Sequence, residues 1–157
     1  MERPAFLVRA SDRAAIREES QKHPLNPDSE IHGWSLSELT GLVRLGVHLI
    51  RIPPGKESFV YHSHRLEEEW LFALSGRAVA EVSDRMIELG PGDFLGFATP
   101  SVAHHLRNPY AEDFVYLTGG ERREMEVADF PRLGKRLVRV GGEATLFPIA
   151  AAEKLPP

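Results

Sequence analysis

Glycine and proline interrupt this chain at short intervals, and the segments between them are rich in Val, Leu, Ile, Phe and Tyr. The chain has 13 Gly and 12 Pro in 157 residues, and they are spread along its length. Breaks at intervals of roughly ten residues are typical of short strands joined by turns, and they leave little room for long helices. We therefore expect an all-β domain, and one of a size that folds around a single core.

The apolar runs predict eight strands and two weaker ones. The eight lie at 43–52, 57–64, 69–74, 78–82, 86–89, 94–98, 103–107 and 114–118, and the weaker two at 136–140 and 145–149. Turn-forming residues separate them, as in Pro53-Pro54-Gly55 and Gly90-Pro91-Gly92-Asp93.

The two ends of the chain differ from this middle part. Ser11-Asp12 can cap a short helix over 13–19, and we expect the polar segment 26–40 to run along the barrel surface. We therefore divide the chain into an N-terminal arm (1–42), a barrel (43–120) and a C-terminal arm (121–157) that packs on the barrel.

Charge and composition exclude several classes of function. The net charge of −4 argues against nucleic acid or an anionic membrane as a partner. The absence of cysteine excludes disulfides and thiolate metal sites. The longest unbroken apolar run, 70–74, is far too short to cross a membrane, and residues 1–10 lack an apolar signal-peptide core. We expect a cytoplasmic protein.

Histidine is the residue type that points to chemistry. His62 and His64 lie two apart in a predicted strand, so their side chains project to the same side. A carboxylate from a neighbouring strand can complete three corners of a metal site, and His104 is a third imidazole candidate. Imidazole with carboxylate suits Fe, Mn, Zn, Ni or Cu better than Ca or Mg.

These residues fall into two motifs that resemble those of the cupins, a family of small double-stranded β-helix barrels. In the first, His62-x-His64 is followed after four residues by Glu69 and after six more by Gly76, although Gly55 lies one residue further upstream than usual. In the second, a Pro91-Gly92-Asp93 turn precedes His104 and Asn108, with a central loop one residue longer than usual. The resemblance covers 55–108 and implies a jelly-roll barrel.

The resemblance also implies a metal held by His62, His64, Glu69 and His104. Glu67 and Glu68 compete with Glu69, but the spacing to Gly76 favours Glu69. His105 competes with His104, but His104 alternates with Val102 and Leu106, an apolar set that should face the interior.

Around the site, the polar residues that can line a pocket are His48, Arg51, Lys56, Tyr61, Arg77, Arg107 and Tyr116. On the 69–74 strand, Trp70, Phe72 and Leu74 should point outward, and this apolar face needs cover. We expect the N-terminal arm, a homodimer interface or both to cover it.

Three interpretations remain open. The first is a metalloenzyme with one divalent ion (Fe, Mn, Zn or Ni) that acts on a small polar molecule. Its chemistry would be that of a dioxygenase, or that of an isomerase or lyase, for example on sugar phosphates. The second is a non-catalytic cupin that binds a small ligand, and a metal-free structural barrel is the third interpretation. The motifs do not identify a general base or a substrate.

Overall fold

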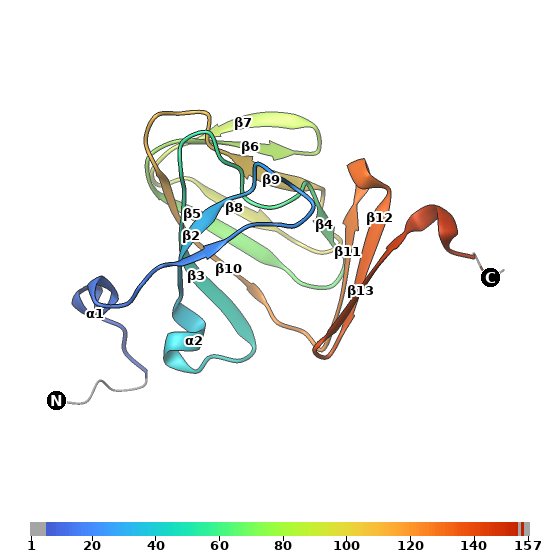
Figure 1. Ribbon diagram of the computed structural model, residues 1–157, viewed down its shortest axis with the longest axis horizontal. Helices are drawn as coiled ribbons and strands as arrows, with labels where there is room; N and C mark the ends of the chain where they lie inside the picture. The colour runs from blue at the N-terminus through green and yellow to red at the C-terminus, as the bar shows by residue number, and fades with distance from the viewer. Residues whose placement is uncertain (1–5, 154, 156–157) are drawn as a thin grey trace.

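Antiparallel strands are the main secondary structure of the molecule (Figure 1). The computed structural model describes residues 6–153 and 155. Every pairing between its named strands is antiparallel. The strands form three sheets, and the architecture is an all-β jelly roll, as predicted.

Each sheet combines strands from different parts of the chain. From edge to edge, the large sheet contains β1 (Glu19–Gln21), β2 (Ile31–Ser35), β3 (Leu45–Ile52), β10 (Phe114–Glu121), β5 (Glu69–Ser75) and β8 (Phe94–Phe97). The small sheet contains β7 (Arg85–Leu89), β6 (Ala78–Val82) and β9 (His104–Arg107). The third sheet contains β13 (Glu143–Pro148), β12 (Lys135–Val140), β11 (Met125–Phe130) and β4 (Ser63–His64).

The helices are short. They are α1 (Ala10–Ala14), α2 (Leu36–Thr40) and two 3-10 turns, Pro131–Leu133 and Ile149–Ala151. Over the described part of the chain, none of them has the length and apolar character that a membrane crossing requires.

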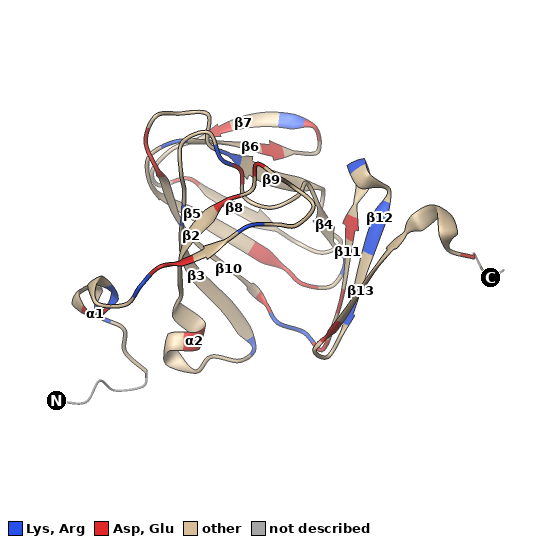
Figure 2. Cartoon of the chain, in the orientation of Figure 1, with Lys and Arg blue, Asp and Glu red and all other residues tan. Residues whose placement is uncertain are grey.

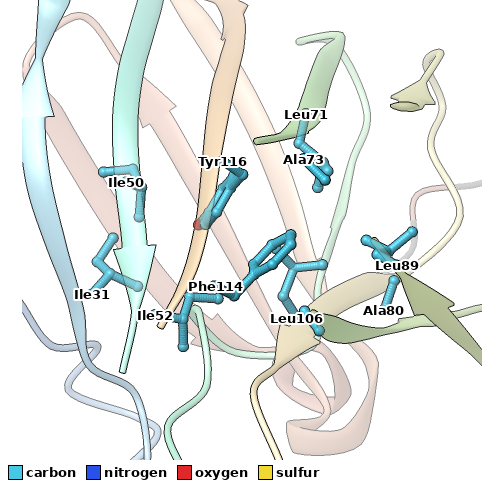
Figure 3. Close-up of a cluster of buried hydrophobic side chains, with 11 residues drawn as sticks. Ile31, Ile50, Ile52, Leu71, Ala73, Ala80, Leu89, Leu106, Phe114 and Tyr116 are labelled. Carbon is cyan, nitrogen blue, oxygen red and sulfur yellow. The ribbon is translucent and has the colours of Figure 1, made fainter. Parts of the chain in front are cut away.

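The core lies between the large sheet and the small sheet (Figure 3). Strand β5 shows how the sequence creates it, because Leu71 and Ala73 are buried whereas Phe72 and Leu74 are exposed. Side chains alternate between the two faces of a strand, so one apolar set faces the barrel interior. Phe114, which is fully buried, stacks on Tyr116 with 5.2 Å between ring centroids.

The predicted strand 57–64 is largely wrong, because only residues 63–64 form a strand. Isolated bridges join Glu57 to Arg107 and His62 to His104. Six residues on one side therefore span four on the other, and the surplus residues bulge out of the ladder. Within the bulge, the Ser58 hydroxyl accepts a hydrogen bond from the Leu106 amide at 2.9 Å.

Two predictions for the N-terminal arm also need correction. The helix spans 10–14 rather than 13–19, and Asp12 lies within it and accepts a hydrogen bond from the Arg9 amide at 2.9 Å. The segment 26–40 is not simply a polar surface stretch. It contains β2, which pairs with β3 and alternates buried and half-buried residues.

The C-terminal segment contains a strand that we did not predict, β11. This strand pairs with β4 on one side and with β12 on the other, and β12 forms a hairpin with β13. In Figure 1 this hairpin stands beside the barrel, at the edge where β4 lies. The division into a barrel and two arms stays a proposal.

Substitution of Phe114 tests the position of the core. Phe114→Ala should lower the free energy of unfolding by about 3–5 kcal/mol, because it removes a fully buried ring and leaves a cavity. Urea denaturation measures this change. The control Phe6→Ala removes a ring that is 83% exposed and should change stability by less than about 0.5 kcal/mol. Equal effects of the two substitutions would contradict the described core.

Candidate metal centre

Four side chains meet where three segments of the barrel come together. His62 lies just before β4 and His64 within it, while Glu69 begins β5 and His104 begins β9. The bridge between His62 and His104 brings two of them side by side: the amide of each donates to the carbonyl of the other, at 3.1 and 2.8 Å. Ligand atoms of His62, Glu69 and His104 all lie within 4.8 Å of one another.

His64 completes the group. Its Nε2 lies 3.0 Å from Nε2 of His62 and 3.6 Å from Oε1 of Glu69. Nε2 of His104 contacts the same Glu69 oxygen. The structure thus brings together all four residues for which the sequence predicted a ligand role.

Backbone carbonyls orient two of the imidazoles. Nδ1 of His62 lies 2.6 Å from the Val60 carbonyl oxygen, and Nδ1 of His104 lies 2.9 Å from that of Val102. A carbonyl oxygen can only accept, so both Nδ1 atoms carry a proton, and in the neutral form of either ring Nε2 presents a lone pair. This arrangement is common for metal-binding histidines, whose second nitrogen donates to an outer partner.

The donor set fits a divalent transition metal. Nε2 of His104 contacts a carboxylate oxygen of Glu69, and either a proton on this nitrogen or a metal ion bound by both atoms satisfies such a contact. Three imidazole nitrogens and one carboxylate oxygen are typical ligands of Fe, Mn, Zn or Ni. The residues present therefore suit a metal ion, whose identity they leave open.

Burial and neighbouring charge keep two of these groups in the form that binds a metal. Burial, with the nearby His64 and His104, lowers the pKa of His62 to about 4. Burial alone would raise the pKa of Glu69, but the hydrogen bond with His104 and the charges of the surrounding imidazoles lower it to about 2. Near neutral pH, His62 is therefore a neutral imidazole and Glu69 a carboxylate.

An aromatic ring fixes the plane of His104. Phe97 of β8 stacks on the imidazole, with 3.7 Å between centroids and 9° between planes. Phe97 pairs with Glu69 across β8 and β5, so the strand beside the carboxylate also supplies the ring. The sequence analysis did not assign Phe97 a role.

The three consecutive glutamates have different surroundings. Glu69 contacts His104, whereas the Glu67 carboxylate accepts a hydrogen bond from the Arg123 amide at 2.6 Å and contacts Arg139. The Glu68 amide donates to the Glu121 carboxylate at 3.0 Å. Glu69 is therefore the one of the three that groups with His62 and His104, whereas Glu67 groups with His64 and Glu126.

His104 and His105 are both buried, each 7% exposed, so burial does not distinguish them. Nε2 of His105 lies 2.8 Å from a carboxylate oxygen of Glu81, and Glu81 also contacts Arg132. This ion-pair group lies on the small sheet, where His105 pairs with Glu81. His105 and Arg132 thus both contact Glu81, and Nε2 of His105 is engaged with Glu81 instead of Glu69.

A cavity of about 300 Å³ opens beside the site, with His62, Glu69 and His104 in its wall. Aromatic side chains line much of it, namely Trp34, Phe59, Trp70, Phe97 and Tyr116. Of the pocket residues suggested by the sequence, His48 and Tyr116 line the cavity and the other five do not. Burial raises the pKa of Tyr116, so its hydroxyl stays protonated.

Substitution of one ligand tests the site. His62→Ala should abolish tight binding of one metal equivalent and the thermal stabilisation that added metal gives the wild type. Elemental analysis and melting curves measure both effects. The matched variant His105→Ala also removes a buried imidazole and should keep the metal. Loss of metal in His105→Ala with retention in His62→Ala would contradict the assignment.

Comparison with known proteins identifies the family to which this architecture belongs. A family model described as Cupin domain matches residues 48–120, which include the four site residues. A search of the curated proteins finds no match. Among solved structures, a protein of Acidithiobacillus ferrooxidans provisionally named a sugar phosphate isomerase has 37% identity and a TM-score of 0.94, with 98% of each chain covered.

More distant structures share the fold. A sugar phosphate isomerase from a cupin superfamily, from Silicibacter pomeroyi, has 20% identity and a TM-score of 0.77 over 88% of this chain and 92% of its own. A polyketide cyclase from Streptomyces resistomycificus has 15% identity and a TM-score of 0.59 over 73% and 80%. The family match, the barrel and the similarity along nearly the whole chain lead to one conclusion: this chain belongs to the cupin superfamily.

Proposed function

We propose that this chain is a metal-dependent isomerase that acts on a small phosphorylated sugar or a related hydroxy-carbonyl compound. The observation that carries the proposal is the convergence of three imidazoles and one carboxylate in the wall of a cavity. The reaction class is suggested by the name of the Acidithiobacillus ferrooxidans protein, which is similar along 98% of both chains. In this proposal His62, His64, Glu69 and His104 hold one divalent ion.

A divalent ion at this position would polarise a carbonyl or hydroxyl oxygen of the substrate. The chain itself supplies the shape of the binding site. Glu69 pairs with Gly120 of β10, which in turn pairs with Gly46 of β3. Two glycines in this row leave the cavity floor without side chains, and the row spans about 10 Å, twice the spacing of neighbouring strands.

A cationic side chain stands at the far end of this glycine row. Arg122 is the only Lys or Arg among the described residues that line the cavity. A Cβ on Gly46 would lie 3.3 Å from both the Arg122 Nε and the His48 Nε2. Arg122 has an ion pair with Glu38 at 3.7 Å, but the Glu38 side chain is 64% exposed, so the pair is weak. We therefore assign Arg122 to the phosphate group of the substrate.

His48 is the candidate for proton transfer in the cavity wall. Burial, with the adjacent Arg122, lowers the pKa of His48, so its imidazole is neutral near neutral pH and can accept a proton. Aromatic walls exclude water and leave the few polar groups to orient the substrate.

Turnover of phosphorylated aldoses by the metal-loaded protein tests the proposal. NMR should detect conversion to the ketose isomer, and His62→Ala should lower the rate at least about 100-fold. Arg122→Gln should raise KM about 10-fold or more for phosphorylated substrates and leave KM for the unphosphorylated sugars unchanged, because one charge-assisted contact is lost. Binding without turnover would instead support a non-catalytic module, and oxygen uptake by the iron form would support a dioxygenase.

We also propose that the chain forms a homodimer through the outer face of β5 and β8. Phe72, Leu74 and Phe94 are 38, 44 and 60% exposed on these two adjacent strands. A cluster of large apolar side chains on the surface is typical of an interaction face. The cytoplasmic location and the absence of nucleic-acid or membrane partners stay predictions.

Sedimentation velocity tests the dimer. Phe72→Asp places a charge in the proposed interface and should convert the wild-type dimer to a monomer. Met86→Asp, at a 57% exposed apolar position on β7, should leave the dimer intact. A monomeric wild type, or a Phe72→Asp variant that still dimerises, would contradict the assignment.

A further inference from the structure

The short loop 65–68 joins two of the proposed metal ligands, since His64 precedes it and Glu69 follows it. We propose that Glu126, on the C-terminal strand β11, is a positioning residue that fixes this loop and the His64 imidazole for metal binding. The inference rests on the proposed metal centre but not on the reaction. Glu126 lies outside the 48–120 segment that matches the cupin family model.

The Glu126 carboxylate is buried, with 3% exposure, and it accepts hydrogen bonds from backbone amides. Three donors belong to the loop: the amides of Arg65 at 3.1 Å, Leu66 at 3.3 Å and Glu67 at 2.6 Å. The Val127 amide donates as well, at 2.6 Å. A buried carboxylate is costly unless it is hydrogen-bonded, so the carboxylate and the loop fix each other's position.

The same carboxylate faces His64. Its Oε2 lies 3.8 Å from Nδ1 of His64, a buried nitrogen without a hydrogen-bond partner among the described residues. With its proton on Nδ1, this imidazole points that proton toward the carboxylate and leaves the Nε2 lone pair for a metal. A carboxylate behind a ligand histidine orients the ring and raises its basicity.

The hairpin behind Glu126 is braced by ion pairs. Glu126 lies opposite Arg139 in the backbone register of β11 and β12. The Arg139 side chain contacts the Glu67 carboxylate. Asp129 pairs with Arg65 of the loop at 2.9 Å and with Arg136 of β12 at 2.6 Å. Figure 2 shows the acidic positions of β11 beside the basic positions of β12.

A second metal site is the competing interpretation, because His64, Glu67 and Glu126 also bring ligand atoms within 4.8 Å. The carboxylates of this trio are already engaged. Glu126 accepts the four amide hydrogen bonds, and Glu67 accepts from Arg123 and contacts Arg139. Backbone N–H groups and a guanidinium group thus occupy the carboxylate oxygens of Glu67 and Glu126 that a cation would need. The trio is therefore better suited to hold the proposed metal ligands in place than to bind a second metal.

Metal affinity provides a readout independent of turnover. Metal-free wild type and Glu126→Gln are titrated with Zn²⁺ against a chromophoric chelator, and Co²⁺ loading reports the ligand geometry by absorption. Glu126→Gln keeps the shape but replaces one of the two carboxylate oxygens with an NH2 group, which cannot accept a hydrogen bond from a loop N–H group. We expect affinity to fall about 10- to 100-fold and the Co²⁺ spectrum to shift. The control Glu143→Gln, at an exposed position that begins β13, should match the wild type.

A double-mutant cycle shows whether Glu126 acts through the site. In the His64→Ala background, Glu126→Gln should cost much less affinity than in the wild type, because the ring that it orients is gone. Wild-type affinity and spectrum in Glu126→Gln would overturn the inference while leaving the metal centre intact. A wild type that binds no metal would overturn the metal centre and the inference together.

Hydrogen exchange on the wild type tests the role of Glu126 without relying on a variant that must fold. The amides of Leu66 and Glu67 should exchange slowly in the metal-free protein, because the carboxylate holds them before any metal binds. Rapid exchange of these two amides without metal would overturn the inference.

Discussion

The site depends on imidazole nitrogens and a carboxylate that face each other across a small buried space. The bridge between His62 and His104 fixes two imidazoles side by side, and the carbonyls of Val60 and Val102 hold their protons on the outer nitrogens. Glu69 then adds a carboxylate oxygen to a space that already contains acceptors. Such a group is costly to desolvate without a cation, and this cost links the barrel fold to metal chemistry.

The other residues of the cavity determine which molecules fit beside the metal site. Trp, Phe and Tyr side chains line part of its wall, whereas Gly46 and Gly120 add no side chain beside Glu69. Arg122 adds a single cationic group beyond these two glycines. Under the proposed function, the substrate places oxygen ligands at the metal site and an anionic group at Arg122, as a phosphorylated sugar can.

The motif residues predicted from the sequence lie together in the structure, whereas the supporting residues were not predicted, for a physical reason. Strand alternation and motif spacing led to His62, His64, Glu69 and His104, although 57–62 bulges and the histidines meet through a bridge. Strand β11 was missed because Glu126 occupies a buried position, where apolar patterning expects an aliphatic side chain. Strand β2 was missed in a similar way, since its buried Gly33 and Ser35 carry no apolar signal.

Anomalous diffraction from crystals of the metal-loaded protein tests the central claim most directly. We predict one metal peak within about 2.0–2.2 Å of the Nε2 atoms of His62, His64 and His104 and of a Glu69 oxygen. A peak among His64, Glu67 and Glu126 instead, or no peak after loading with Fe, Mn, Zn and Ni in turn, would contradict the account.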